Sequence, residues 1–185
     1  MLGNSLLHDK KWMFSESQTV NCAVQGLTLQ KFLPLFEAVP PLVPDVIVVA
    51  FGTVEVVQAD RRFKEDDLLS SEVNTSAFRK SIHRLLDKLK ESWPDAKLII
   101  NSVPPTRKRD WQAPTTASQN IMKLNQVILD IVSHKQYADI HLIDLSSVLD
   151  LEGSVLSEDM TYDGIHLTKK AYQKWFGELR SLMRK

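Results

Sequence analysis

The sequence predicts an α/β fold, a three-layer α/β/α sandwich around a parallel sheet of the flavodoxin-like kind. Three short apolar runs rich in β-branched residues alternate with helical patterns, at residues 45–51 (DVIVVAF), 96–102 (AKLIINS) and 139–145 (DIHLIDL). Buried parallel strands have this continuous apolar character. Strands that alternate with helices form parallel βαβ units, whose ligands bind beyond the carboxyl ends of the strands.

The remaining elements follow from weaker signals in the same chain. A fourth apolar run, residues 19–24, precedes Gly26 and is expected to pair at or near an edge of the sheet. Helical spacing predicts three amphipathic helices, the first capped by Asn74 or Thr75 and stopped at Trp93-Pro94, the last capped by Thr168. Their apolar positions are Phe78, Ile82, Leu85, Leu86 and Leu89; Ile121, Leu124, Ile128 and Ile131; and Ala171, Trp175, Leu179 and Leu182.

Size and charge limit the function classes. At 185 residues we expect one domain over residues 1–185. The 23 basic residues balance the 23 acidic ones. A neutral chain has no overall electrostatic attraction for nucleic acid, so we expect no nucleic-acid partner. The only local basic cluster is the short run Arg107, Lys108 and Arg109.

Cysteine usage and hydropathy bear on the compartment. Cys22 is the only cysteine, so the chain can form no internal disulfide and no multi-cysteine zinc site, and we expect a small buried apolar role for it. No apolar run approaches the ~18 residues of a membrane span. The chain is therefore expected to be cytoplasmic, with no membrane span.

Two local patterns could carry chemistry. Ser5 follows Gly3-Asn4 where a strand could pass into a helix, so free backbone N–H groups could receive an oxyanion beside it. Asp163 stands three residues before His166, so the carboxylate could orient the imidazole. Taken singly, each pattern also fits a structural role: a capping or turn serine, and a turn aspartate beside a surface histidine.

The order of four motifs along the chain favours the chemical interpretation. They are G-N-S-L at residues 3–6, N-C-A-V-Q-G at 21–26, P-D-V-I-V-V-A-F-G-T at 44–53 and D-G-I-H-L-T at 163–168. Together they resemble the four sequence blocks of the SGNH (GDSL-like) serine esterases. The resemblance covers essentially the whole chain, including residues 98–107 and 141–145.

This resemblance implies a role for each matching residue. Ser5 matches the nucleophile, whose backbone N–H is also an oxyanion donor, and Gly26 matches the second donor. Asp163 and His166 match the orienting acid and the general base. The implied activity is cleavage of small acyl esters, above all acetyl esters and including those on carbohydrate, through an acyl-serine intermediate and without metal or organic cofactor. Two alternatives stay open: a polysaccharide O-acetyltransferase and a catalytically weak binding module of this fold.

Three departures from the family pattern matter. Asn4 replaces an aspartate, a change we expect to be tolerated. Val54 stands where the family has an asparagine that supplies a third oxyanion donor, and valine cannot donate a hydrogen bond. Such a loss typically costs about 3 to 4 kcal/mol of transition-state stabilisation, unless Thr53 or Asn101 replaces the donor.

The third departure concerns the first strand, which is central in this fold. Here it would consist of Met1 and Leu2 alone, which predicts unpaired backbone groups, a groove in the core and residues missing before Met1.

Other polar residues receive more modest interpretations. The loop after the predicted strand at residues 96–102 carries Arg107 and Trp111, which would suit a sugar or anionic substrate, although a plain solvated loop fits equally well. His83 is expected to be solvated on a helix rich in Lys and Arg. Asp144 ends a strand and is expected to cap the following turn.

Overall fold

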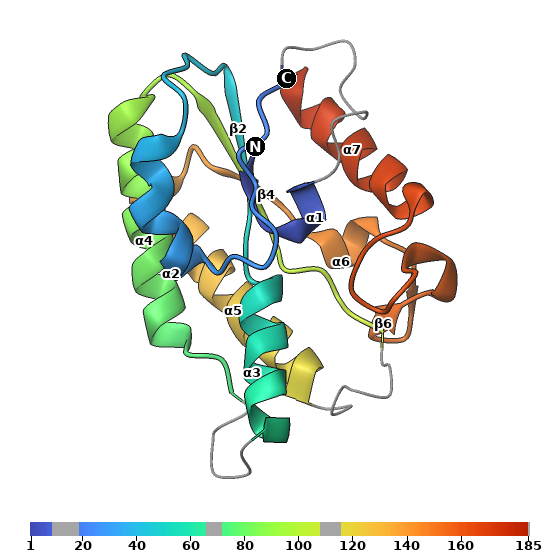
Figure 1. Cartoon of the computed structure of the whole chain (residues 1–185). Coiled ribbons are helices and arrows are strands. Elements are labelled where there is room, and N and C mark those ends of the chain that lie inside the picture. The colour runs from blue at the N-terminus through green and yellow to red at the C-terminus, as the bar shows by residue number, and fades with distance from the viewer. Residues whose placement is uncertain (9–18, 66–71, 108–115, 185) are drawn as a thin grey trace.

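The computed structural model describes residues 1–8, 19–65, 72–107 and 116–184 (Figure 1). Four parallel strands form its main sheet in the order β1-β2-β3-β4. They are β1 (Leu2–Gly3), β2 (Val46–Ala50), β3 (Lys97–Asn101) and β4 (His141–Ile143). Cα partners include Leu2 with Val49, Val48 with Ile99, and Ile99 with His141. The three predicted apolar runs correspond to β2, β3 and β4, and the predicted α/β class is confirmed.

The segment at residues 19–24 lies beside β1, as expected, although its backbone has no regular strand geometry. The N–H of Cys22 donates to the Met1 carbonyl at 2.9 Å, and the N–H of Val24 donates to the Gly3 carbonyl at 3.0 Å. The Met1 amine donates to the Val20 carbonyl at 2.7 Å. The short β1 therefore lies between this segment and β2.

The predicted groove is present next to β1. It measures about 490 Å³, and its lining includes Met1, Val20, Cys22, Val46 and Val48. Because the register with Leu2 begins only at Val49, residues 46–48 of β2 extend past the end of β1 and form one wall. Burial there lowers the pKa of the Met1 amine.

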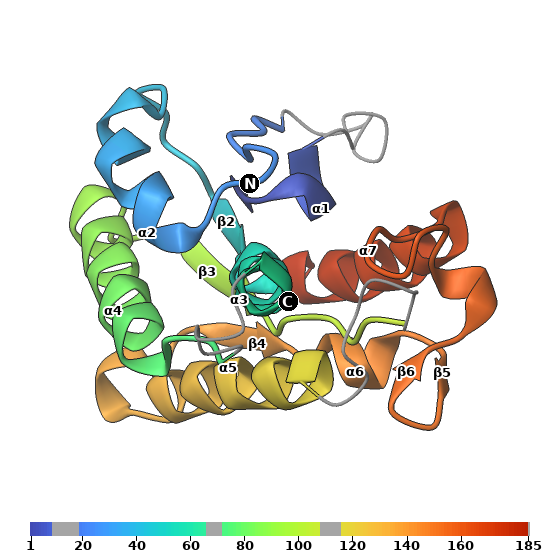
Figure 2. The same ribbon diagram turned by 60° about the horizontal axis from the view of Figure 1, so that its bottom comes forward.

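Helices cover both faces of the sheet (Figure 2). The three predicted helices are α4 (Thr75–Ser92), α5 (Thr116–Val132) and α7 (Lys169–Met183). Asn74 caps α4 by accepting from the N–H of Ala77 at 2.9 Å, and Thr168 caps α7. The shorter helices are α1 (Ser5–His8), α2 (Leu29–Phe32) and α6 (Leu145–Val148). A further helix, α3 (Thr53–Glu65), follows β2 and was not among the predicted helices.

The remaining elements are small. Within the described residues, 3-10 helices occupy Leu33–Ala38, Lys135–Tyr137 and Glu158–Met160. A hairpin of β5 (Leu151–Glu152) and β6 (Val155–Leu156) follows α6.

Two hydrophobic clusters form the core, one on each face of the sheet. Ile47 and Val49 of β2 point into the cluster under α2, α4 and α5, while Val48 and Ala50 point into the cluster under α1, α6 and α7. This alternation follows from the two-residue period of a strand. In the described part of the chain, no helix combines the length and the apolar character needed to cross a bilayer.

Candidate active site

Ser5 lies where the first strand passes directly into a helix. β1 ends at Gly3 and α1 begins at Ser5, so the serine sits at a helix N-terminus at the carboxyl end of the sheet. A Cβ on Gly3 would lie 2.6 Å from the Ala50 carbonyl oxygen, so the close approach of β1 to β2 requires glycine there. Asn4 is fully buried and accepts from the N–H of Leu6 at 3.1 Å.

The structure brings Ser5 together with two residues from the other end of the chain. The Ser5 hydroxyl lies 3.2 Å from Nε2 of His166, and Nδ1 of His166 lies 2.5 Å from Oδ2 of Asp163. Because a carboxylate only accepts, Nδ1 carries the proton and Nε2 is free to accept from Ser5. The arrangement has the geometry of an activated serine nucleophile.

Asp163 is held by both of its oxygens. Oδ1 accepts from the N–H groups of Ile165 and His166, at 2.9 and 2.7 Å, while Oδ2 faces the imidazole. Burial raises the pKa of Asp163, but the hydrogen bonds from His166 and Ile165 outweigh it and keep the pKa below its ordinary range. The carboxylate is therefore charged at neutral pH and can stabilise an imidazolium.

Hydrogen bonds to main-chain groups fix the loop that carries Asp163 and His166. The hydroxyl of Thr161 donates to the His166 carbonyl at 2.8 Å and accepts from the N–H of Gly164 at 2.8 Å. The N–H of Arg107 donates to the Gly164 carbonyl at 2.8 Å. Gly164 has a φ of 88°, a conformation that favours glycine.

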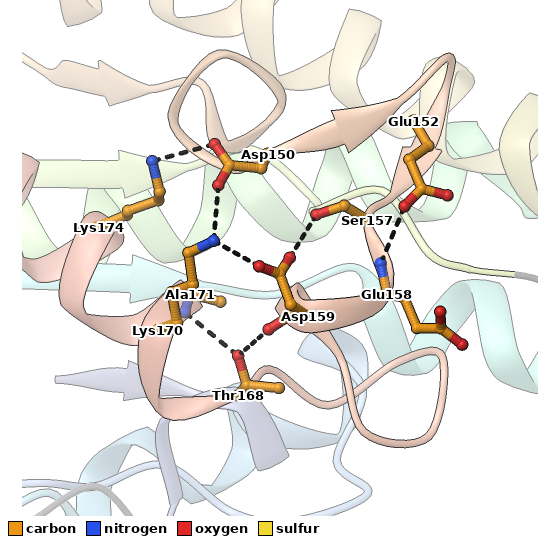
Figure 3. Close-up of polar contacts among 9 residues, drawn as sticks. All are labelled: Asp150, Glu152, Ser157, Glu158, Asp159, Thr168, Lys170, Ala171 and Lys174. Carbon is orange, nitrogen blue, oxygen red and sulfur yellow. Dashed lines mark hydrogen bonds and ion pairs between the residues drawn. The ribbon is translucent and has the colours of Figure 1, made fainter.

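A second layer of charged contacts surrounds this loop (Figure 3). We call it the outer clamp, and it consists of Asp150, Asp159, Lys170 and Lys174. Lys170 on α7 contacts both aspartates, and Lys174 contacts Asp150 at 3.0 Å. These contacts tie the chain that precedes the catalytic loop to the helix that follows it.

The segments that the family resemblance assigns to the oxyanion side come from other parts of the chain. Gly26 has a φ of 68° in a turn that precedes α2. Oε1 of Glu55, in α3, accepts from the N–H of Leu29 at 2.7 Å, and Oε2 accepts from the N–H of Gly52 at 3.1 Å. Burial raises the pKa of Glu55, and these N–H groups oppose the rise.

Val54 occupies the first turn of α3 and is 8% exposed. Of the two proposed replacements for a third donor, Asn101 is fully buried and already engaged. Its amide donates to the Val49 carbonyl at 2.9 Å, and its oxygen accepts from Nε1 of Trp175 at 2.7 Å. Asn101 is therefore a core residue and no oxyanion donor, while Thr53 lies 3% exposed beside Val54.

Other predicted residues lie farther out. The Arg107 guanidinium donates to Glu152 at 2.7 Å and to the Leu156 carbonyl at 3.1 Å, so it stabilises the β5–β6 hairpin. A substrate that binds Arg107 would have to share the guanidinium with these two acceptors. Trp111, Lys108 and Arg109 lie outside the described residues.

Three further residues of the sequence analysis have defined surroundings. Asp144 caps α6 by accepting from the N–H of Ser146, as predicted. Cys22 is partly buried against the core. His83 was expected to be solvated, but its ring lies 3.1 Å from the Tyr137 hydroxyl.

Two residues near the site were not found from the sequence. Tyr162 is 60% exposed, and its ring stacks on that of His166 at a centroid distance of 5.8 Å. Glu55 stands three residues after Gly52, which is the spacing of a capping box and could have revealed its contact with that N–H. No local pattern in the sequence indicates its second contact, with Leu29.

Comparisons with known proteins identify the family of the chain. A family model described as the GDSL-like lipase/acylhydrolase family matches residues 6–174. No curated protein matches the chain.

Several solved structures share its fold. A GDSL-like lipase from Bacteroides thetaiotaomicron is 21% identical with a TM-score of 0.76, covering 99% of this chain and 85% of its own. An aryl esterase from M. smegmatis is 17% identical with a TM-score of 0.61, covering 89% and 77%. A carbohydrate esterase family 3 protein from Talaromyces cellulolyticus is 18% identical with a TM-score of 0.57, covering 88% and 69%.

Proposed function

Since the chain belongs to the GDSL-like lipase/acylhydrolase family, and is therefore a carboxylic ester hydrolase, we propose that Ser5, His166 and Asp163 are its nucleophile, general base and orienting acid. The observation that carries this proposal is the hydrogen-bonded chain from the Ser5 hydroxyl through the His166 ring to Asp163. It joins residues 161 positions apart in the sequence.

The proposed reaction proceeds in two halves. Nε2 of His166 takes the proton of the Ser5 hydroxyl as Oγ attacks the ester carbonyl, and it then returns that proton to the leaving alcohol. In the second half, His166 takes a proton from water as it attacks the acyl-Ser5 carbonyl, and His166 then returns that proton to Ser5 Oγ as its bond to the acyl carbon breaks and the acid leaves. Asp163 holds the ring in the required tautomer and stabilises its cation in both halves.

We propose that the N–H groups of Ser5 and Gly26 form the oxyanion hole. The first belongs to a helix N-terminus, where an N–H has no partner within the helix. The second lies in a glycine turn that is tied to the nucleophile's strand through the bond from Val24 to Gly3. With Val54 at the third position, only two backbone donors are assigned to the developing charge.

For the substrate we propose a small acyl ester, above all an acetyl ester, including esters on carbohydrate. The exposed Tyr162 ring beside His166 offers a flat apolar surface on which a sugar ring could rest. The similar Talaromyces protein carries the name carbohydrate esterase. Transfer of the acetyl group to a polysaccharide uses the same acyl-serine, and Val54 supports the further alternative of a catalytically weak binding module.

The test is hydrolysis of nitrophenyl acetate and longer nitrophenyl esters by wild type and Ser5→Ala. We expect Ser5→Ala to lose at least about a thousandfold in kcat, because no other group can carry the acyl intermediate. The variant should stay folded, since a helix-start serine contributes at most about 2 kcal/mol as a cap.

Labelling provides the control for this experiment. A serine-directed phosphonate should modify wild type at Ser5 and leave Ser5→Ala unmodified. Wild-type turnover by Ser5→Ala would remove Ser5 from the mechanism. Comparing deacetylation in water with acetyl transfer to an added oligosaccharide separates hydrolase from transferase.

A further inference from the structure

The Glu55 carboxylate connects two helix starts that border the oxyanion side. One oxygen accepts from the N–H of Gly52, just before α3, and the other accepts from the N–H of Leu29, the first residue of α2. The donor residues Gly52 and Leu29 lie 3 and 26 positions before Glu55 in the sequence. A carboxylate that accepts two backbone N–H groups fixes the distance between them.

These two helix starts border the proposed oxyanion hole. Gly26 lies three residues before Leu29, and Val54 lies two residues after Gly52. On its other side the Gly26 turn is anchored to β1 by the bond from Val24 to the Gly3 carbonyl at 3.0 Å. The turn is therefore held between the nucleophile's strand and Glu55.

The contact with Gly52 alone would make Glu55 an ordinary helix-capping residue. The contact with Leu29 goes beyond that role, because capping α3 does not require a second chain segment. Gly52 has a φ of 115°, and a Cβ there would lie 2.3 Å from Cγ2 of Val103, so the backbone at this contact is closely packed. A displacement at Glu55 would consequently be passed to the turn before α2, whose backbone is tied to β1 and to Glu55 by hydrogen bonds.

We propose that Glu55 is a positioning residue that sets the aim of the Gly26 N–H relative to Ser5. This inference rests on the proposed function, because it assumes that the Gly26 N–H is an oxyanion donor. Glu55 does not touch the substrate and acts through the two backbone contacts. Because Val54 offers no side-chain donor, stabilisation of the oxyanion depends on the direction in which the Ser5 and Gly26 N–H groups point.

Glu55→Gln tests the proposal, with Asn74→Ala as its matched control. The Gln oxygen can accept one N–H, but its amide group cannot accept the other, so one of the two contacts is lost. Asn74 also caps a helix start through a side-chain oxygen, on α4. Both variants should lower Tm by about 2 to 4 °C, as loss of a cap does in a chain of this size.

Only Glu55→Gln should change catalysis. We expect kcat for nitrophenyl acetate to fall at least about tenfold with KM within about twofold, because a misaimed donor weakens transition-state binding selectively. A kcat equal to that of Asn74→Ala, or higher than wild type, would overturn the proposal while leaving the function of Ser5 intact.

Backbone amide spectra separate failure of this inference from failure of the proposed function. In Glu55→Gln the Gly26 resonance should shift together with those of Leu29 and Gly52, whereas Asn74→Ala should leave all three in place. If wild type hydrolyses no ester, the proposed function fails, and these spectra still decide whether Glu55 positions Gly26. An unmoved Gly26 resonance in Glu55→Gln would overturn the inference.

Discussion

The acid–base half of the site and its oxyanion half are built in different ways. Asp163 and His166 lie in one short loop, and Thr161 holds that loop through two hydrogen bonds to its backbone. The proposed oxyanion half joins the start of α1 at Ser5, the Gly26 turn and the start of α3 at Thr53, which are separated in sequence by 21 and 27 residues.

The two halves also differ in completeness. The chain from Asp163 through His166 to Ser5 has all its contacts, whereas the position that would carry a side-chain oxyanion donor holds Val54. From this difference we expect stabilisation of the oxyanion, rather than proton transfer, to limit the rate. The variants below test each half of that statement.

The largest effect is expected on the acid–base side, from Asp163→Asn. An amide can donate to Nδ1 and hold the ring with its proton on Nε2, where it can no longer accept from Ser5. We expect kcat to fall by about 10⁴-fold at neutral pH with a folded protein, as measured on nitrophenyl acetate. If Asp163→Asn retained wild-type activity, the acid–base half would rest on another carboxylate, and Asp144 at the end of β4 would be the next to test.

A smaller effect in the opposite direction is expected on the oxyanion side, from Val54→Asn. Val54 is nearly buried in the first turn of α3, so an asparagine there would bring two N–H donors to the site. A well-aimed donor is worth about a hundredfold, and we expect at least about a tenfold gain after discounting for imperfect aim. The gain should appear in kcat rather than KM, because the bond forms mainly in the transition state.

The matched control for this variant is Val54→Leu, which changes side-chain shape without adding a donor. A gain in both variants would point to packing rather than hydrogen bonding. A fall in kcat in Val54→Asn with the fold intact would mean that Val54 lines the acyl site or that another group already supplies the third donor. Either result would remove the contrast between the two halves.

The sequence predicted the fold through local patterns. The strand runs are apolar and β-branched, and the caps Asn74 and Thr168 mark the starts of their helices in the structure. The start of α3 was missed, because Gly52 and Val54 are not strong helix-start residues and Glu55 is the one signal of a cap.

The site was predictable only in part, for a physical reason. Asp163 and His166 share one turn, so their spacing carries the information, whereas the contact of Glu55 with Leu29 depends on how two separate segments pack. Asn101 is a residue for which the sequence suggested a role in the site that packing of distant segments excludes. Its position at the end of β3 suggested a donor to the site, but packing of α7 brings Trp175 onto its oxygen and leaves it in the core.

The smallest effect is expected from the outer clamp, through Lys170→Met. This lysine is half exposed, and salt bridges at the surface contribute little because water and salt screen them. The His166 loop keeps its backbone contacts through Thr161 without the clamp, so kcat should stay within about twofold of wild type.

Thr161→Val is the informative comparison, since it preserves shape but removes the hydroxyl that accepts from Gly164 and donates to the His166 carbonyl. Loss of that hydroxyl should lower kcat by about tenfold, because small misplacements of a catalytic group are costly. If Lys170→Met were instead the more damaging of the two, the charged surface contacts rather than the buried hydroxyl would hold the catalytic loop, and the acid–base half would be less self-contained than its geometry indicates.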